Sequence, residues 1–281
     1  MPLFYRFYFL VMDALNKRGG AIKEYKKRLT AKAEKTGVIK QGFALLYPAY
    51  KKYFYCDKNT GEGYFFRYKP IKEKGEYPVV IYHHGNGLNR AGKNDVQLVE
   101  FSKLIKKLNK RKCHQIAVHL DVSCEYNREA YSRALDGIVR FIKQTYNNVD
   151  FDRIYLTGTS HGGYACVYEV LRNPERYAAA VISMSYTYNE KFAPPDEIQE
   201  NPYVRILTDD DYEALSKTPF CLSWAKDDCE LMVVSNNLLS EKLKKNNGDV
   251  KLKVYENGGH TIAGDFFKNS DWDEWLFAKE R

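Results

Sequence analysis

The sequence predicts an α/β fold built on a mostly parallel, twisted sheet with helices on both faces. From residue 77 onward, short runs of β-branched and apolar residues alternate with longer stretches of helical periodicity. Parallel strands need crossover connections, and the intervening helices would supply them. The composition, 44% hydrophobic and 28% charged, is that of a globular protein and excludes disordered or collagen-like chains.

Six apolar runs are expected to be strands of the main sheet. They cover residues 78–82, 115–120, 153–156, 178–184, 220–224 and 250–255. Between and after them the periodicity predicts helices at 96–108, 128–145, 162–172, 232–245 and 272–279. Upstream, residues 47–69 are aromatic and alternating, with the turn signal Asn59-Thr60-Gly61 between two runs. That pattern predicts a β-hairpin.

The basic residues concentrate in the N-terminal quarter of the chain. Residues 1–75 hold 17 Lys and Arg against 6 Asp and Glu, whereas the remainder holds 27 against 30. We therefore divide the chain into a basic helical extension at 1–45 and a catalytic domain at 46–281. The extension packs on the body or on a second copy of the chain in a homodimer, or else residues 1–40 lie as an amphipathic segment on an anionic membrane. Nucleic acid is excluded as a partner, since the body is slightly acidic and has no reading motif.

One segment interrupts the alternation of strands and helices. Residues 186–218 contain Pro194, Pro195 and Pro202 and an acidic run at 209–211. Ligands of open α/β sheets bind beyond the carboxyl ends of the strands, so this segment is expected to be a short lid-like insertion. The acidic run is expected to be solvated lid charge, and the insertion's aromatic residues suit either stacking on a substrate or a packed lid core.

The strongest local motif is Gly158-Thr159-Ser160-His161-Gly162, which has the form G-x-S-x-G. It directly follows one predicted strand and precedes a predicted helix, the setting of a nucleophile elbow. Glycines suit that turn because strand and helix approach each other closely there. The motif predicts that Ser160 is a nucleophile above the sheet, with the helix N-terminus beneath developing negative charge.

A serine nucleophile needs a base, and the base needs an orienting acid. His260 lies in a glycine-rich loop directly after the strand predicted at 250–255. Between nucleophile and base, the strand predicted at 220–224 is followed by Asp227 and Asp228. We prefer Asp227 as the acid and keep Asp228 as the alternative.

A second glycine-rich turn, His83-His84-Gly85-Asn86-Gly87, follows the strand predicted at 78–82. A turn at this place can direct a backbone N–H at the oxygen of a tetrahedral intermediate, with the N–H of His161 as the second donor. The chain order of serine, acid and histidine is that of the α/β-hydrolases.

With these parts, residues 53–281 resemble the α/β-hydrolase superfamily, in particular the esterase D, feruloyl esterase and polyhydroxybutyrate-depolymerase-like group, many of whose members are labelled predicted peptidases related to prolyl oligopeptidase. The resemblance rests on GYFFRYKP, HHGNG, DFDRIYLTGTSHGGYA, NPERYAAAVISMS, AKDD and GGH. It implies an α/β-hydrolase fold, a Ser160, Asp227 and His260 triad, and oxyanion donors at Asn86 or Gly85 and at His161.

We therefore expect a serine carboxylic-ester hydrolase that forms an acyl-enzyme on short acyl or hydroxycinnamoyl (feruloyl-type) esters. The alternatives are a peptidase of prolyl-oligopeptidase type, for which the chain offers no propeller-sized extension to grip a peptide, and a catalytically inactive binding protein on a hydrolase fold. The chemistry requires no cofactor and no metal. The six cysteines show no metal-site or paired spacing. They are read as free thiols, and the apolar start at residues 1–12 is not read as a secretory signal, so a cytoplasmic location is expected.

Overall fold

A nine-stranded sheet organises the residues that this computed structural model describes, namely 38–43, 47–56, 63–85, 101–119, 129–194 and 206–281. The strands are β1 (Val38–Phe43), β2 (Lys51–Cys56), β3 (Gly63–Lys69), β4 (Tyr77–His83), β5 (His114–His119), β6 (Val149–Thr159), β7 (Ala179–Ser183), β8 (Phe220–Ala225) and β9 (Val250–Tyr255). Their spatial order is β1-β2-β3-β5-β4-β6-β7-β8-β9. From β5 through β4 to β9 every neighbouring pair is parallel. The prediction of an α/β fold with a mostly parallel sheet is confirmed.

The N-terminal strands form an antiparallel edge. β2 and β3 pair from Lys51 opposite Tyr68 to Cys56 opposite Gly63, which is the predicted hairpin. β1 pairs antiparallel with β2. Its residues were assigned to the helical extension, and that assignment is wrong for them: the β-branched pair Val38-Ile39 suits a strand, and the backbone of β2 offers an open edge. The membrane or subunit role expected of residues 1–37 lies outside the described residues.

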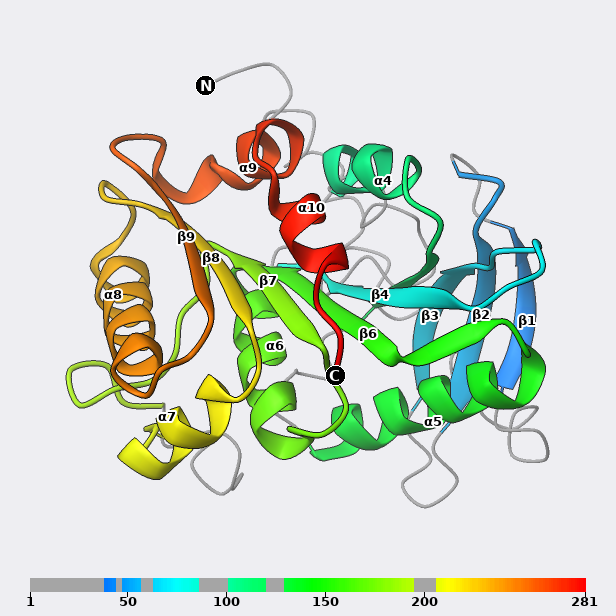
Figure 1. The fold of residues 1–281 in the computed structure, drawn as a ribbon, viewed down its shortest axis with the longest axis horizontal. Coiled ribbons are helices and arrows are strands. Elements are labelled where there is room, and N and C mark those ends of the chain that lie inside the picture. The colour runs from blue at the N-terminus through cyan, green and yellow to red at the C-terminus, as the bar shows by residue number, and fades with distance from the viewer. Residues whose placement is uncertain (1–37, 44–46, 57–62, 86–100, 120–128, 195–205) are drawn as a thin grey trace, which may run out of the picture.

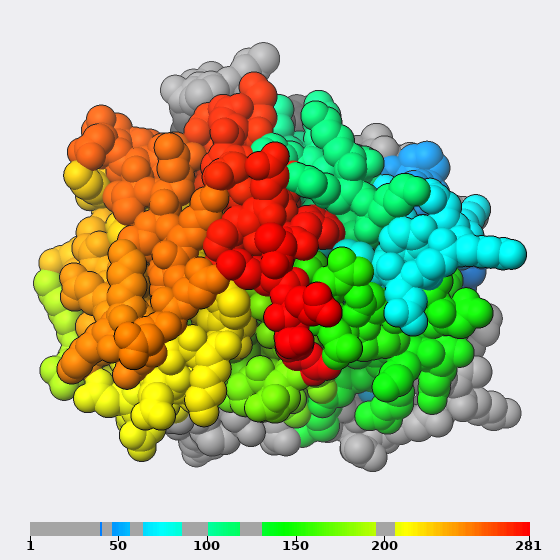
Figure 2. Space-filling view, viewed as in Figure 1, coloured from blue at the N-terminus to red at the C-terminus, as the bar shows by residue number. Residues whose placement is uncertain are grey.

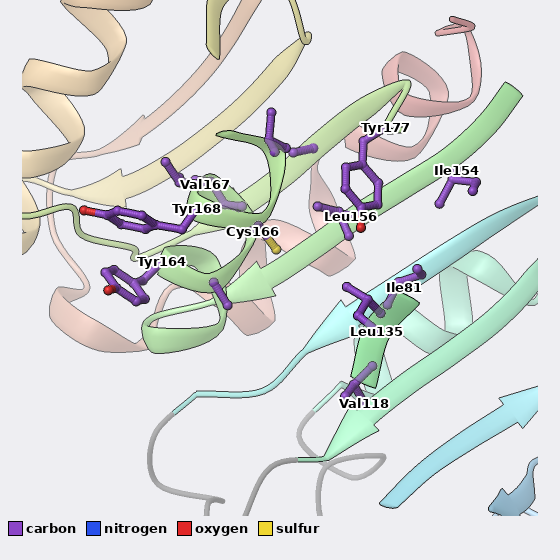
Figure 3. Packing of buried hydrophobic residues seen from close by; sticks show 14 of the residues in the cluster. Ile81, Val118, Leu135, Ile154, Leu156, Tyr164, Cys166, Val167, Tyr168 and Tyr177 are labelled. Atoms are coloured by element: carbon purple, nitrogen blue, oxygen red, sulfur yellow. The ribbon is translucent and has the colours of Figure 1, made fainter. Parts of the chain in front are cut away.

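Two layers of helices cover the two faces of the sheet (Figure 1). The helices are α4 (Ser102–Leu108), α5 (Glu129–Thr145), α6 (His161–Arg172), α7 (Asp209–Ser216), α8 (Glu230–Lys245), α9 (Ala263–Asn269) and α10 (Trp272–Phe277). Side chains of α4, α9 and α10 pack in one buried cluster with Val80 and Val181. Side chains of α5, α6, α7 and α8 pack in another with Ile81 and Ile182. Figure 3 shows part of this second cluster, with Ile81 of β4, Leu135 of α5 and Tyr164 of α6. Successive strand residues point to opposite faces, so neighbours such as Val80 and Ile81 serve different layers.

The predicted helices correspond to α5, α6, α8 and α10 and, for 96–108, to α4 over the residues that are described. Two further helices, α7 and α9, were not expected. The acidic run expected as solvated lid charge forms the first turn of α7, in which Asp209 and Asp210 are exposed. Thr208 and Asp211 form a capping box, in which each side chain bonds the other's backbone N–H, and Asp211 is buried. Because α7 packs on α6 and α8 and leads into the start of β8, it lies toward the amino ends of the strands (Figure 1).

Helix α6 is fastened to its surroundings by a buried carboxylate. Glu169 accepts hydrogen bonds from Ser132 of α5 at 2.9 Å and from Tyr177 at 2.8 Å, just before β7. Burial raises the pKa of Glu169, and the bonded donors oppose that shift. The helix that begins directly after Ser160 is thereby tied to two other elements.

The first turn of α6 lies in contact with the backbone of β4 and β6. A Cβ added at Gly162 would lie 2.2 Å from the carbonyl oxygen of His83 and 2.7 Å from that of His84. One added at Gly158 would lie 2.3 Å from the carbonyl oxygen of Gly162. These are backbone atoms, which cannot rotate aside as the end of a side chain can. The close approach therefore requires glycine at both positions.

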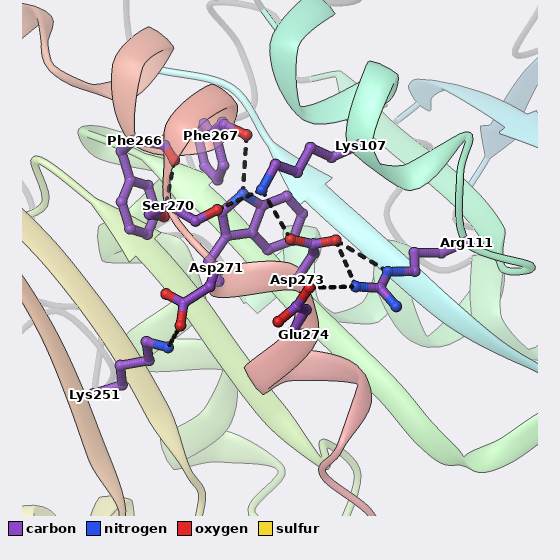
Figure 4. A network of polar contacts seen from close by, with 10 residues as sticks. Lys107, Arg111, Lys251, Phe266, Phe267, Ser270, Asp271, Asp273 and Glu274 are labelled. Atoms are coloured by element: carbon purple, nitrogen blue, oxygen red, sulfur yellow. Dashed lines mark hydrogen bonds and ion pairs between the residues drawn. The ribbon is translucent and has the colours of Figure 1, made fainter.

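The C-terminal helices are held to the α4 region by charge and to each other by aromatic packing (Figure 4). The carboxylate of Asp273, largely buried, accepts from Lys107 at 3.1 Å and from Arg111 at 3.0 Å. The rings of Phe267 and Trp272 pack edge to face at 5.5 Å. The space-filling view shows this C-terminal segment crossing the face of the molecule beside α4 (Figure 2).

Gly162→Ala tests the close approach of α6 to β4. We expect the free energy of unfolding to fall by about 1–3 kcal/mol, because the added methyl group must displace backbone. Urea unfolding followed by circular dichroism measures it. Gly264→Ala in α9 is the matched control, since nothing lies within 4 Å of its added Cβ, and helix propensity favours alanine there. Equal stability of the two variants would contradict the prediction.

Asp273→Asn tests the lock on the C-terminal helices. Removing the charge leaves Lys107 and Arg111 facing a neutral, poorer acceptor, so we expect unfolding in urea to cost about 1–3 kcal/mol less. Glu274→Gln is the control, because that side chain is 75% exposed and lies 3.8 Å from Arg111. A surface pair of this kind contributes little. A loss as large for Glu274→Gln as for Asp273→Asn would show that general surface charge, and not this buried carboxylate, holds the helices.

Candidate active site

Ser160 lies on a sharp turn between β6 and α6, the strand-turn-helix setting that the motif predicts. Its backbone has φ 52° and ψ −122°, in the positive-φ region that a residue with a side chain rarely adopts. The N–H of Ser160 donates to the carbonyl of Ser183 at the end of β7 at 3.0 Å. The strained turn is thus pinned to the neighbouring strand, and it presents the hydroxyl above the carboxyl ends of the strands.

His260 reaches Ser160 from the turn that follows β9, at the same carboxyl edge of the sheet. It lies in a short 3₁₀ turn, Gly259–Thr261, four residues after β9 ends. Its Nε2 is 2.9 Å from the Oγ of Ser160, although the two residues are a hundred positions apart. The structure therefore brings together the two side chains that the sequence singled out as nucleophile and base. The imidazole is 41% exposed, so water can reach it.

The acid beside His260 is Asp228 and not the preferred Asp227. The Oδ2 of Asp228 lies 2.9 Å from the Nδ1 of His260, and this side chain is only 2% exposed. Asp227 is exposed, and its two carboxylate oxygens accept from the backbone N–H groups of Gly258 and Gly259 instead. The preference for Asp227 as the partner of the imidazole is therefore wrong. These two adjacent side chains point in different directions, and of the two only that of Asp228 points toward the imidazole of His260.

The turn expected to supply oxyanion donors is described up to Gly85. It follows β4, which lies next to β6, with His83 level with Gly158. The carbonyls of His83 and His84 touch Gly162, so this turn and the start of α6 share one corner of the site. His161, the other expected donor, is the first residue of α6, where helix N–H groups point out of the helix end. Asn86 lies outside the described residues.

Aromatic side chains that the sequence placed in the lid lie against His161. The ring of His161 stacks on Tyr164 at 5.4 Å and an angle of 8°, and Tyr164 stacks on Tyr186 at 5.1 Å. The hydroxyl of Tyr186 and the Nδ1 of His161 are 2.7 Å apart. Tyr186 and Tyr188 are half-buried and alternate with the buried Ser185 and Thr187. We call His161, Tyr164, Tyr186 and Tyr188 the aromatic wall.

Burial sets the charge of the wall. Desolvation lowers the pKa of His161 to about 4, so its imidazole is neutral at pH 7. The wall is therefore a neutral surface that begins one residue from the nucleophile. Sequence reasoning did not foresee that the ring of His161 packs against the tyrosines of the wall. The pairing of tyrosines at 186 and 188 with one at 164 was the available signal.

The other described histidine side chains belong to the core. His83, His84 and His114 are buried, and burial lowers the pKa of His83 to about 3. His114 bonds the hydroxyl of Tyr68 at 2.6 Å. Within the described ranges no three His, Cys, Asp or Glu residues are grouped as a metal site would require. Nor does any helix there combine the length and apolar character needed to cross a bilayer. Five of the six cysteines are free, and Cys124 lies outside the described residues.

Solved structures with the same fold include an esterase, a hydrolase and a peptidase. A thermostable esterase matches with a TM-score of 0.68 and 22% identity over 84% of this chain and 64% of that one. S-formylglutathione hydrolase of Staphylococcus aureus matches with 0.62 and 14% over 81% and 95%. Acylaminoacyl peptidase of Pyrococcus horikoshii matches with 0.56 and 17% over 77% and 39%. The chain thus spans less than two thirds of the esterase and of the peptidase.

Comparison with curated protein sequences gave no match. The model of the prolyl oligopeptidase family matches residues 122–278, more than half of the chain and all three residues that meet at the site. The resemblance to α/β-hydrolases, and within them to relatives of prolyl oligopeptidase, is thereby confirmed. A nine-stranded, mostly parallel sheet with a serine at its strand-to-helix elbow, and this family match, show that the chain belongs to the prolyl oligopeptidase family of α/β-fold serine hydrolases.

Proposed function

We propose that the protein is a serine carboxylic-ester hydrolase that works through an acyl-enzyme. The observation that carries the proposal is the chain of two 2.9 Å contacts from Ser160 to His260 and from His260 to Asp228. With Nδ1–H donating to Asp228, the lone pair of Nε2 faces the serine hydroxyl, which is the tautomer that a general base needs. The shielded carboxylate then stabilises the imidazolium that forms.

The reaction follows from this arrangement. The Oγ of Ser160 attacks the acyl carbon while its proton passes to Nε2 of His260. The bond from the acyl carbon to the alcohol oxygen breaks as Nε2–H protonates the departing oxygen. Water then gives a proton to Nε2 and its oxygen attacks the acyl carbon, which releases the acid and restores the serine hydroxyl. The exposure of His260 supports this second half, because the water must reach the imidazole.

Backbone donors stabilise the oxygen of the tetrahedral intermediate. The N–H of His161 belongs to the residue after the nucleophile, at the positive end of α6. The second donor comes from the turn after β4, with Gly85 or Asn86 as its source. Each such donor contributes about 3 kcal/mol to lowering the barrier.

Esters are the proposed substrates, with a planar aryl acyl group of hydroxycinnamoyl type as the preferred acid. The aromatic wall supports this choice, since stacking on a neutral face favours a conjugated ring over a short aliphatic chain. Peptide bonds are the second candidate, supported by the family and by the similarity to acylaminoacyl peptidase. Esters are favoured because the esterase and the formylglutathione hydrolase match larger shares of both chains than the peptidase does.

Ser160→Ala is expected to abolish turnover of 4-nitrophenyl esters and methyl ferulate, because it removes the hydroxyl that lies at Nε2 of His260. Wild type and variant are assayed on these esters and on a peptide 4-nitroanilide. Labelling by a fluorophosphonate probe, with the modified peptide identified by mass spectrometry, locates the nucleophile. Ester turnover that survives in the variant contradicts the nucleophile assignment. Anilide turnover in excess of ester turnover supports the peptidase, and a wild type that neither labels nor turns over is an inactive binding protein.

Tyr186→Leu tests the aryl preference. The preference is the ratio of kcat/KM for 4-nitrophenyl cinnamate to that for 4-nitrophenyl acetate, which share a leaving group. We expect this ratio to fall about 2- to 10-fold, the loss of one aromatic stacking contact. Tyr186→Phe is the control, since it keeps the ring and removes only the hydroxyl that meets His161. If the ratio is unchanged in Tyr186→Leu, the wall does not hold the acyl group.

A further inference from the structure

The two adjacent aspartates after β8 have separate partners on one loop. Asp228 meets the imidazole of His260, while Asp227 accepts from the N–H of Gly258 at 3.1 Å and from that of Gly259 at 2.8 Å. We propose that Asp227 is a positioning residue, which holds the backbone immediately before His260 and so fixes the imidazole against Ser160. The inference rests on the proposed function, in which His260 is the general base.

Among the described residues, the backbone of the loop that carries the base makes few other hydrogen bonds to neighbouring elements. Gly258 and Gly259 have φ of 131° and 49°, values that glycine adopts freely, so both can also leave them freely. Gly258 is exposed and Gly259 is partly exposed. Thr261 closes the turn locally, through its hydroxyl and N–H on the carbonyl of Gly258. That bond shapes the turn but does not tie it to another element. Asp227 does, because it comes from the turn after β8.

The chemistry of the acceptor suits two adjacent amides. Each oxygen of the carboxylate takes one N–H, and an ionised acceptor makes a stronger bond than a neutral one. The bonds from Gly259 and Gly258 hold the pKa of Asp227 below its ordinary value. The carboxylate therefore stays ionised throughout the pH range in which a histidine can act as a base.

Exposure determines what the loss of this contact would change. Water can replace Asp227 at both amides, so the folded state loses little when the side chain is removed. Water does not fix where the loop lies, however. A displacement of about 1 Å between reacting groups can cost about 100-fold in rate. Loss of Asp227 should therefore appear in the chemical step rather than in stability.

A second side-chain contact joins the same two turns and provides a matched control. Lys226 and Glu256 form an exposed ion pair at 2.6 Å, and the N–H of Lys226 donates to the carbonyl of Tyr255. These contacts extend the pairing of β8 with β9 (Figure 1) and stop before the two glycines. Glu256→Gln removes a charge from the same surface without touching the amides that Asp227 holds.

The first experiment compares full-length wild type with Asp227→Ala, Asp227→Asn and Glu256→Gln on 4-nitrophenyl acetate. We expect kcat of Asp227→Ala to be lower about 10- to 100-fold, with KM and the urea unfolding midpoint close to those of wild type. Asp227→Asn keeps one acceptor oxygen and should recover part of the loss, and Glu256→Gln should match wild type. Asp227→Ala with wild-type kcat, or with a loss that Glu256→Gln reproduces, overturns the inference.

The second experiment separates the two aspartates. Asp228→Asn removes the partner of Nδ1 and is expected to lower kcat about 10⁴-fold, far more than any change at Asp227. If Asp227→Asn shows the larger loss, Asp227 is the orienting acid and the division proposed here is wrong.

The third experiment does not depend on any ester substrate. Hydrogen exchange of the Gly258 and Gly259 amides, followed by nuclear magnetic resonance, should be faster in Asp227→Ala than in wild type, and unchanged exchange overturns the inference. Fluorophosphonate labelling of Ser160 should slow in parallel with kcat. Labelling as fast in Asp227→Ala as in wild type removes the positioning role while the serine hydrolase assignment stands. A wild type that does not label removes both.

Discussion

The contact between the first turn of α6 and the end of β4 sets the geometry on which the site depends. Helix backbone meets strand backbone there with no side chain between, at Gly162 and at Gly158. The chain must then reverse within a single residue, and Ser160 takes the strained φ and ψ that follow. The same approach brings the turn after β4 to the start of α6, where an oxyanion would need its donors. Nucleophile, donors and the ring of His161 are thus placed by one packing contact.

The main architecture was predictable because most of its strands, such as β4, β7 and β8, are buried on both faces. Such strands are continuous apolar runs, and all six predicted runs are strands of the sheet. The edges were harder to predict. The residues of β1 form neither a continuous apolar run nor a regular alternation of apolar and polar side chains. They form a strand because their backbone can pair with the open edge of β2. Helix α7 was hidden by an acidic run that resembles a solvated loop but forms the start of a helix, with Thr208 as its N-cap and Asp211 completing the capping box.

The site was predictable in its chain order and not in its finer detail. Ser160 and His260 follow from motif and order, since strand ends on one edge of a parallel sheet bring distant residues together. The choice between Asp227 and Asp228 could not follow from spacing, because one step along a turn changes the direction of the side chain entirely. Likewise, the sequence shows that Tyr186 is aromatic, but only folding shows that it stacks beside the nucleophile and bonds His161.

The parts of the site differ in how firmly the sheet holds them. Ser160 follows β6, which has a partner on both sides. His260 follows β9, which among the described strands pairs with β8 alone and is only partly buried. Edge strands open at a lower free energy than central ones. We therefore expect the base to detach at a lower free-energy cost than the nucleophile. Heat or denaturant would then produce a folded but inactive form before it produces an unfolded one. Activity would return from that form once β9 pairs with β8 again.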